Sequence, residues 1–253
     1  MISFLKNLIT CAGDICRKEQ NNLNSDDVAF KNPKDLVTIV DKQVESFLIH
    51  EIKTRYPEHD VLGEETGRSG SKSRFLWIID PIDGTTSFFH GQPFYSVSIA
   101  LQKDEEIILG AVYAPALNQL FMGELGKGAY LNDMPINVSN TKNLIDAVMA
   151  TGFACLRAGL KENNLVHFNK IVPKLRDIRR YGSAAIDLCY VACGKLDGFW
   201  EMQLNIYDIA AGALIVKEAG GNLSDFSGGK GFPEKGIVVA NSSLHPLLIK
   251  LLE

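Results

Sequence analysis

The chain has 253 residues, of which 46% are hydrophobic and 22% are charged, and this composition is typical of an ordinary globular protein. Its net charge of −4, without a basic block, gives no reason to expect direct nucleic-acid binding. No apolar run approaches the about 18 residues that a membrane span requires. Five cysteines without zinc-type spacing favour a reducing compartment. The sequence therefore predicts a cytoplasmic protein that does not enter a membrane.

The first half of the chain opens with helical patterns and continues with strand patterns. Apolar residues at helical spacing predict an amphipathic helix within residues 1–16 and a second helix from about residue 40 to residue 56. Residues 31–35 and 67–73 read as loops, and we interpret Lys31 as an ordinary surface lysine. Asn132-Asp133 is typical of a hairpin tip. Strand patterns cover residues 61–62, 75–79, 95–101, 107–114 and 119–123.

The second half alternates strands with helices. Strands are predicted at residues 147–151, 198–202 and 237–240, and helices at 165–175, 183–193, 208–219 and 244–252. No repeat or long flexible linker interrupts the chain. Residues 1–253 are therefore expected to form a single unit in which mixed sheets are layered with helices, an α/β (α+β) fold.

The most informative segment is residues 77–86, with the sequence WIIDPIDGTT. It begins as a buried strand and ends with Asp80 and Asp83, which offer hard oxygen ligands for a divalent cation. Gly84 permits a tight turn, and either of the two threonines that follow could cap a helix whose free N–H groups hold a phosphate. The alternative is a strand that runs into a common Asp-Gly turn.

Further acids lie far from this segment in the sequence. Glu64 and Glu65 follow a predicted strand, and since they are adjacent in an extended segment, only one of them can face a given metal. Asp208 is expected to be the first residue of an Ala-rich helix. Alone, the first pair reads as a solvated turn and Asp208 as a helix cap. The interpretation as a site requires that all these segments converge.

In the order and spacing of these segments the chain resembles the inositol monophosphatase family of magnesium-dependent, lithium-sensitive phosphatases. Residues 63–66 are similar to its GEE motif, residues 77–86 to its WIIDPIDGTT motif, and residues 207–221 to its WDxAAG…EAGG segment. The resemblance covers nearly the whole chain. It implies a layered αβαβα sandwich of the sugar-phosphatase type with mixed, largely antiparallel sheets. It also implies a metal- and phosphate-binding half at about residues 1–140 and a substrate-side half at residues 141–253.

The resemblance implies a set of metal ligands. One ion would be held by Glu64, Asp80 and the backbone carbonyl of Ile82, and a second by Asp80, Asp83 and Asp208. A third, weaker ion would lie near Glu64, so that two to three Mg²⁺ ions are expected. Carboxylate-rich, cysteine-free ligation also points to magnesium over zinc or copper.

The resemblance further implies which residues act on water and phosphate. Glu64 and Thr85 would orient the attacking water, Asp41 would accept a hydrogen bond from Thr85, and the N–H groups of Gly84 and Thr85 would hold phosphate oxygens. The implied substrate-binding set is Ile82, Asp83, Gly84, Thr85, Gly182, Ser183, Ala184, Glu201 and Asp208.

The sequence gives fewer indications of which residues bind the organic part of the substrate. Glu201 matches the family's glutamate that receives substrate hydroxyls, although without the resemblance it could be a surface acid. For Arg179-Arg180 a subunit interface is preferred over pairing with acidic groups. The family's tryptophan before the last metal aspartate is Tyr207 here, and residues 203–206 also depart from the best-known members. These departures leave the natural substrate open.

The expected function is hydrolysis of inositol monophosphate, a small phosphorylated polyol, by metal-activated water in a magnesium-dependent phosphomonoesterase. Histidinol phosphate and fructose 1,6-bisphosphate remain alternative substrates. A regulatory protein that interacts with the transcription machinery is the alternative from another class. The resemblance also implies a homodimer.

Overall fold

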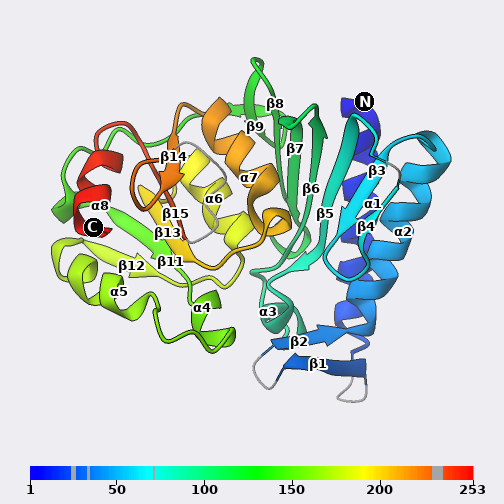
Figure 1. Cartoon of the computed structure of the whole chain (residues 1–253), viewed down its shortest axis with the longest axis horizontal. Helices are drawn as coiled ribbons and strands as arrows, with labels where there is room; N and C mark the ends of the chain where they lie inside the picture. Colours follow the sequence, from blue (N-terminus) through cyan, green and yellow to red (C-terminus); the bar gives the residue numbers. More distant parts are fainter. Residues whose placement is uncertain (24–26, 33–34, 71, 230–235, 253) are drawn as a thin grey trace.

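The described residues form two large β-sheets that alternate with three layers of helices (Figure 1). The structure, a computed structural model, describes residues 1–23, 27–32, 35–70, 72–229 and 236–252. One outer layer consists of α1 (Ile2–Gln20) and α2 (Ile39–Arg55), the middle layer of α6 (Ala184–Ala192) and α7 (Ile206–Glu218), and the other outer layer of α5 (Leu165–Ile171) and α8 (His245–Leu252). This order confirms the predicted αβαβα sandwich. Within the described residues, no helix combines the length and the apolar character that a membrane crossing needs.

The larger sheet has eight strands in the order β10-β9-β8-β7-β6-β5-β3-β4. Only β3 and β5 pair in parallel, and every other neighbouring pair is antiparallel. The strands are β3 (Asp60–Gly63), β4 (Gly67–Ser69), β5 (Phe75–Asp83), β6 (Ser96–Lys103), β7 (Glu106–Ala114), β8 (Gln119–Glu124), β9 (Gly128–Leu131) and β10 (Met134–Ile136). The sheet is therefore mixed and largely antiparallel, as predicted.

The smaller sheet has five strands in the order β12-β11-β13-β15-β14. β11 pairs in parallel with both of its neighbours, whereas β15 pairs antiparallel with both of its own. The strands are β11 (Val148–Thr151), β12 (Asp177–Arg179), β13 (Gly198–Met202), β14 (Asn222–Asp225) and β15 (Gly236–Ala240). The predicted division near residue 140 falls between the two sheets. Whether the chemistry divides there stays a prediction.

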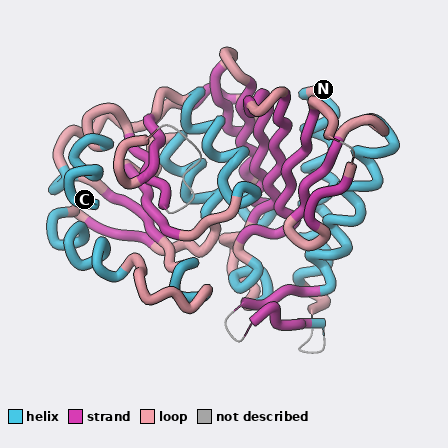
Figure 2. The backbone as a smooth tube through the Cα atoms, in the orientation of Figure 1, coloured by secondary structure: helices cyan, strands magenta, loops and turns pink. Residues whose placement is uncertain are grey.

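Shorter elements connect the layers. β1 (Val28–Asn32) and β2 (Asp35–Thr38) form a separate antiparallel ribbon. The remaining helices are α3 (Thr85–Phe89), α4 (Ala154–Arg157) and the 3₁₀ helices Pro115–Leu117, Leu144–Asp146 and Val172–Lys174. In Figure 2 the strands of the two sheets stand on either side of the middle helices.

The middle layer is buried because it packs between both sheets. All nine residues of α6 are buried, as the largely apolar pattern of residues 183–193 predicts. α7 packs on the larger sheet on one side and reaches the smaller sheet on the other. Each fully buried aliphatic side chain contributes about 1.5–3 kcal/mol, so the central cluster holds the two halves together.

Several boundaries differ from the sequence predictions. Residues 31–35, expected as a loop, belong to β1 and β2 apart from 33–34, which lie outside the described residues, as does the side chain of Lys31. Residues 67–69 form the edge strand β4, and Asn132-Asp133 forms the predicted hairpin tip between β9 and β10. These short strands form because their backbones pair with a neighbouring strand, and such pairing cannot be predicted from the periodicity of the side chains.

Candidate active site

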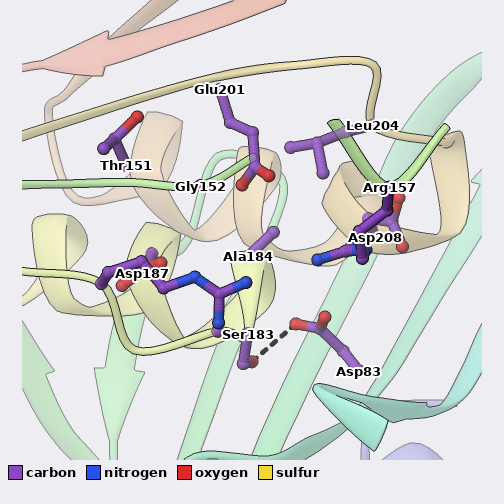
Figure 3. Close-up of a pocket in the computed structure, with 12 residues that line it drawn as sticks. Asp83, Thr151, Gly152, Arg157, Ser183, Ala184, Asp187, Glu201, Leu204 and Asp208 are labelled. Carbon is purple, nitrogen blue, oxygen red and sulfur yellow. Dashed lines mark hydrogen bonds between the residues drawn. The ribbon is translucent and has the colours of Figure 1, made fainter. Parts of the chain in front are cut away.

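The candidate site lies where the end of β5 meets the beginnings of α3, α6 and α7, and it consists of two adjoining cavities. They share Asp83, Arg157, Arg180, Gly182 and Asp208. The first cavity is completed by Glu64, Asp80, Ile82, Gly84, Thr85 and Thr86. The second cavity, drawn in Figure 3, is completed by Thr151, Gly152, Ser183, Ala184, Asp187, Glu201 and Leu204. The structure therefore brings together segments that are far apart in the sequence, as the interpretation as a site required.

Three carboxylates converge in the first cavity. Asp80 and Asp83 come from β5 and Asp208 from α7, and one oxygen of each lies within 4.8 Å of the others. Asp80 is only 1% exposed. These are the three residues predicted to hold the second metal ion.

The three carboxyl groups disfavour one another's negative charge. The pKa of Asp80 lies well above its ordinary value, first because the group is buried and then because Glu64, Asp83 and Asp208 add like charge. Loss of water likewise raises the pKa of Asp83 and of Asp208. A divalent cation would neutralise this charge and favours oxygen ligands, so the donor set fits a metal ion.

Asp83 also joins the two halves of the chain. Its Oδ2 accepts a hydrogen bond from the Ser183 hydroxyl at 2.6 Å (Figure 3). It accepts another from the Ala185 backbone N–H at 2.7 Å. Both donors belong to the beginning of α6, where the helix dipole favours an anion. One carboxylate oxygen of Asp83 is thus fixed in place by α6.

Thr85 and Asp41 form the predicted pair. The Thr85 hydroxyl lies 3.2 Å from Asp41 Oδ1 and 3.0 Å from the Ile82 carbonyl, so it can donate to either oxygen. Asp41 Oδ2 accepts from both the N–H and the hydroxyl of Thr38. Burial raises the pKa of Asp41 to about 6, although the hydrogen bonds from Thr38 oppose the shift. The catalytic roles of Thr85 and Asp41 stay predictions.

Gly84 shapes the turn between Asp83 and α3. Its φ of +87° lies in the left-handed region, and a Cβ there would come within 2.8 Å of the Phe94 carbonyl. Gly84 itself occupies the N-cap position, and no side chain caps α3. The prediction that one of the threonines caps this helix was therefore wrong, because Thr85 already lies inside α3 and directs its hydroxyl back toward β5 and α2.

Glu64, and not Glu65, lines the first cavity. The turn that carries both residues is held by Glu45 of α2, which is fully buried and accepts hydrogen bonds from the N–H groups of Glu65 and Thr66 at 2.9 and 2.8 Å. Sequence reasoning missed Glu45. The sequence feature that could have identified Glu45 is its i, i+4 spacing from Asp41, which places both acids on the buried face of one helix, where acids are rare.

Asp208 enters the cavity from the first turn of α7. The prediction that it begins this helix was wrong, because α7 starts at Ile206 and Asn205 is the N-cap residue. The Asp208 carboxylate reaches back to accept a 2.6 Å hydrogen bond from the Asn205 N–H. It therefore stabilises the helix end and still faces Asp80 and Asp83.

The predicted substrate residues Gly182, Ser183, Ala184 and Glu201 all line the second cavity. Glu201 is 5% exposed, and its Oε1 accepts a 2.9 Å hydrogen bond from the Ala154 N–H. Burial raises its pKa to about 7. Gly152 makes room for it, since a Cβ there would lie 2.1 Å from Glu201 Oε2. The structure thus brings the set together, and its role in binding substrate stays a prediction.

Three charged residues of the second cavity were not predicted as part of the site. Arg157 and Arg180 line both cavities, and Asp187 of α6 lines the second. Arg179 instead forms an ion pair with Asp177. The interface preferred for Arg179-Arg180 stays untested in a single chain, but Arg180 now has a place in the site. A basic residue two positions before the Gly182-Ser183 turn was the available signal.

Comparison with known proteins agrees with this geometry. The model of the inositol monophosphatase family matches residues 1–253. This chain belongs to the inositol monophosphatase family. It is 39% identical over 241 residues to the inositol-1-monophosphatase of Mesorhizobium japonicum, covering 94% of this chain and 91% of that protein. It is 41% identical over 230 residues to the Nus factor SuhB of Pasteurella multocida, covering 90% and 86%.

A solved structure of the family shows the same fold. The crystal structure of extragenic suppressor protein suhB from Bartonella henselae superposes with a TM-score of 0.92 at 37% identity, and the match covers 100% of this chain and 98% of that one. Membership of the family supports a metal-dependent phosphatase that acts on a small phosphorylated substrate. The acidic cluster is its candidate metal site.

Proposed function

We propose that this chain is a magnesium-dependent phosphomonoesterase that hydrolyses inositol monophosphate to inositol and phosphate. The observation that carries the proposal is the convergence of Asp80, Asp83 and Asp208, with oxygens within 4.8 Å, beside the Thr85–Asp41 pair. A phosphate monoester is doubly negative and repels a nucleophile, so its hydrolysis needs concentrated positive charge that such carboxylates can anchor.

The residues assigned to two to three Mg²⁺ ions are Glu64, Asp80, Asp83, Asp208 and the backbone carbonyl of Ile82. When bound, the ions would neutralise phosphate charge, lower the pKa of water and stabilise the leaving oxygen. The expected inhibition by lithium belongs to the same assignment. Asp208 lies beyond residue 140, so we assign residues 1–140 most of the metal and phosphate contacts, and residues 141–253 the substrate side together with this one ligand.

Thr85 and Glu64 are assigned the positioning of water. If the Thr85 hydroxyl donates a hydrogen bond to Asp41 Oδ1 at 3.2 Å, the lone pairs of its oxygen can accept a hydrogen bond from water in the first cavity. Glu64 lines the same cavity and would accept a hydrogen bond from the second O–H of that water. The N–H groups of Gly84 and Thr85 are assigned to the phosphate oxygens.

The second cavity supports a polyol as the organic part of the substrate. Its lining carries several carboxyl groups and two guanidinium groups, and Glu201 offers acceptors to hydroxyls. Release of phosphate should be measured with inositol 1-phosphate, histidinol phosphate and fructose 1,6-bisphosphate, each with and without magnesium. We expect metal-dependent turnover that is fastest with inositol 1-phosphate. A large preference for histidinol phosphate would overturn the substrate assignment, and turnover of none of the esters would overturn the enzyme assignment.

A second candidate function is a regulatory role with the transcription machinery. The observation that favours it is the 41% identity to a protein named Nus factor SuhB. Asp83→Asn separates the two functions, because it removes a charge from the carboxylate cluster inside the fold. Loss of the cellular phenotype together with catalysis would favour the enzyme, whereas an intact phenotype with abolished catalysis would favour the regulatory role.

We also propose a homodimer, by analogy within the family, and a cytoplasmic location. Light scattering of the purified protein across a range of concentrations tests the first proposal. A mass of one subunit throughout would contradict it.

A further inference from the structure

Asp187 is an unusual residue in the second cavity. It lies in α6 and is only 2% exposed, yet it lines the cavity. Its Oδ1 is buried and has no hydrogen-bond partner among the described residues. In Figure 3 it stands on the opposite side of the view from Asp208, with Glu201 above and Asp83 below. Asp187 therefore borders the side of the second cavity away from Asp208.

The position of Asp187 in the first turn of α6 does not account for its burial. An acid there interacts favourably with the helix dipole, but an exposed side chain would gain the same interaction without losing water. A buried carboxyl group without a partner destabilises the fold, and here Glu201 and Asp83 add like charge, with only Arg180 opposing them.

A structural aspartate in the same half of the chain shows the contrast. Asp197 accepts a hydrogen bond from the Ser139 hydroxyl at 2.6 Å and another from the Val148 N–H at 2.8 Å, so both of its oxygens have partners. Asp197 lines neither cavity. It therefore serves the fold, whereas Asp187 lines the second cavity and accepts no hydrogen bond from the part of the chain that the structure describes, so its partner is expected to arrive with a ligand.

We propose that Asp187 is a specificity-determining residue that binds a hydroxyl group of a polyol phosphate, on the side of the second cavity away from Asp208. The inference rests on the proposed function. Asp187 and Glu201 line one cavity from different elements, α6 and β13, so they offer acceptors to different hydroxyls of one ring. The phosphate end of the substrate is left to the first cavity.

The test compares a substrate that has hydroxyls with one that lacks them. Initial rates with magnesium are measured on inositol 1-phosphate and phenyl phosphate for the wild type, Asp187→Ala and Asp187→Asn. We expect Asp187→Ala to raise KM for inositol 1-phosphate by about tenfold, which is the effect of one lost hydrogen bond. The KM for phenyl phosphate should change by less than about twofold. Asp187→Asn, which keeps one acceptor, should restore part of the affinity.

Asp197→Asn is the matched control, and the thermal midpoint Tm is measured for all variants. We expect Asp197→Asn to lower Tm and leave both KM values unchanged, and Asp187→Ala to leave Tm equal to or above that of the wild type. Equal effects of Asp187→Ala on both esters, or a lower Tm with unchanged KM, would overturn the inference. Failure of the wild type to hydrolyse either ester would instead overturn the proposed function.

Discussion

The two cavities of the site are built in different ways. The first takes six of its eleven lining residues from one continuous segment, residues 80–86, which runs from the end of β5 through the turn at Gly84 into α3. The second collects its residues from more widely separated elements, namely β5, β11, α4, the start of α6, β13 and α7, together with the loops beside them. A continuous segment confines its members to one local geometry, whereas scattered residues can be exchanged one at a time. The difference suggests a fixed chemistry in the first cavity and an adjustable substrate choice in the second.

The strongest test of the first cavity is Asp80→Asn. We expect kcat/KM with magnesium to fall by more than about a thousandfold, because a shared ligand would be lost from both metal positions. The circular dichroism spectrum and Tm should stay close to those of the wild type, since the amide has the same shape and relieves the repulsion around Asp80. Turnover close to that of the wild type would contradict the bridging assignment.

A smaller loss is expected from Thr85→Ala. Removal of the hydroxyl that contacts Asp41 should lower kcat by about a hundredfold and leave KM nearly unchanged, because water would lose its orientation while the phosphate contacts remain. Thr10→Ala is a matched control, since the Thr10 hydroxyl only donates to the Lys6 carbonyl within α1. An unchanged kcat for Thr85→Ala would remove Thr85 from the mechanism.

The contrast between the cavities also explains what the sequence could predict. The positions of Asp80 and Asp83 could be predicted because a strand, a turn and the start of a helix follow one another there. The structure of such a segment depends mainly on residues that are adjacent in the sequence. The start of α7 was misplaced by two residues because the cap at Asn205 competes with an equally plausible cap at Asp208. The long elements were predicted, whereas the three-residue strands β4, β10 and β12 were not, because they depend on pairing partners.

Arg157 and Asp187 illustrate the limit for the site itself. Each is a single charged residue in a helix, and its own neighbours in the sequence give no sign that it lines a cavity. Only the packing of α4 and α6 around β13 brings them to Glu201. The family resemblance supplied Glu201 itself, while local chemistry read in isolation could not separate it from a surface acid.

Substitutions that affect the second cavity should reduce activity less than those in the first. Arg180→Gln is expected to raise KM by about tenfold for all phosphate esters, because the guanidinium group lines both cavities and can donate to phosphate. The control is Arg176→Gln, whose side chain pairs with Asp146 and lines neither cavity. Steady-state kinetics on two esters measures both variants. An unchanged KM for Arg180→Gln would exclude a contact with the phosphate.

The smallest expected effect is a pH dependence of stability that comes from two buried carboxyl groups, Asp41 beside Thr85 and Glu201 in the second cavity. In the metal-free protein the pKa of Asp41 is raised to about 6 and that of Glu201 to about 7, in both cases chiefly by burial. A raised pKa means that the folded state keeps a proton which the unfolded state releases. The stability that these groups contribute is therefore full below about pH 4 and is lost as pH rises through 6 to 7.

We expect Tm to fall by about 5 °C between pH 5 and pH 8. Glu201→Gln and Asp41→Asn should each make this fall smaller, as measured by calorimetry with a chelator present. Added magnesium should raise Tm most at pH 8, where the first cavity carries the most negative charge. A Tm that instead increases with pH would show that these carboxyl groups are charged and well paired without the metal, and the cavities would then be ordinary polar clefts.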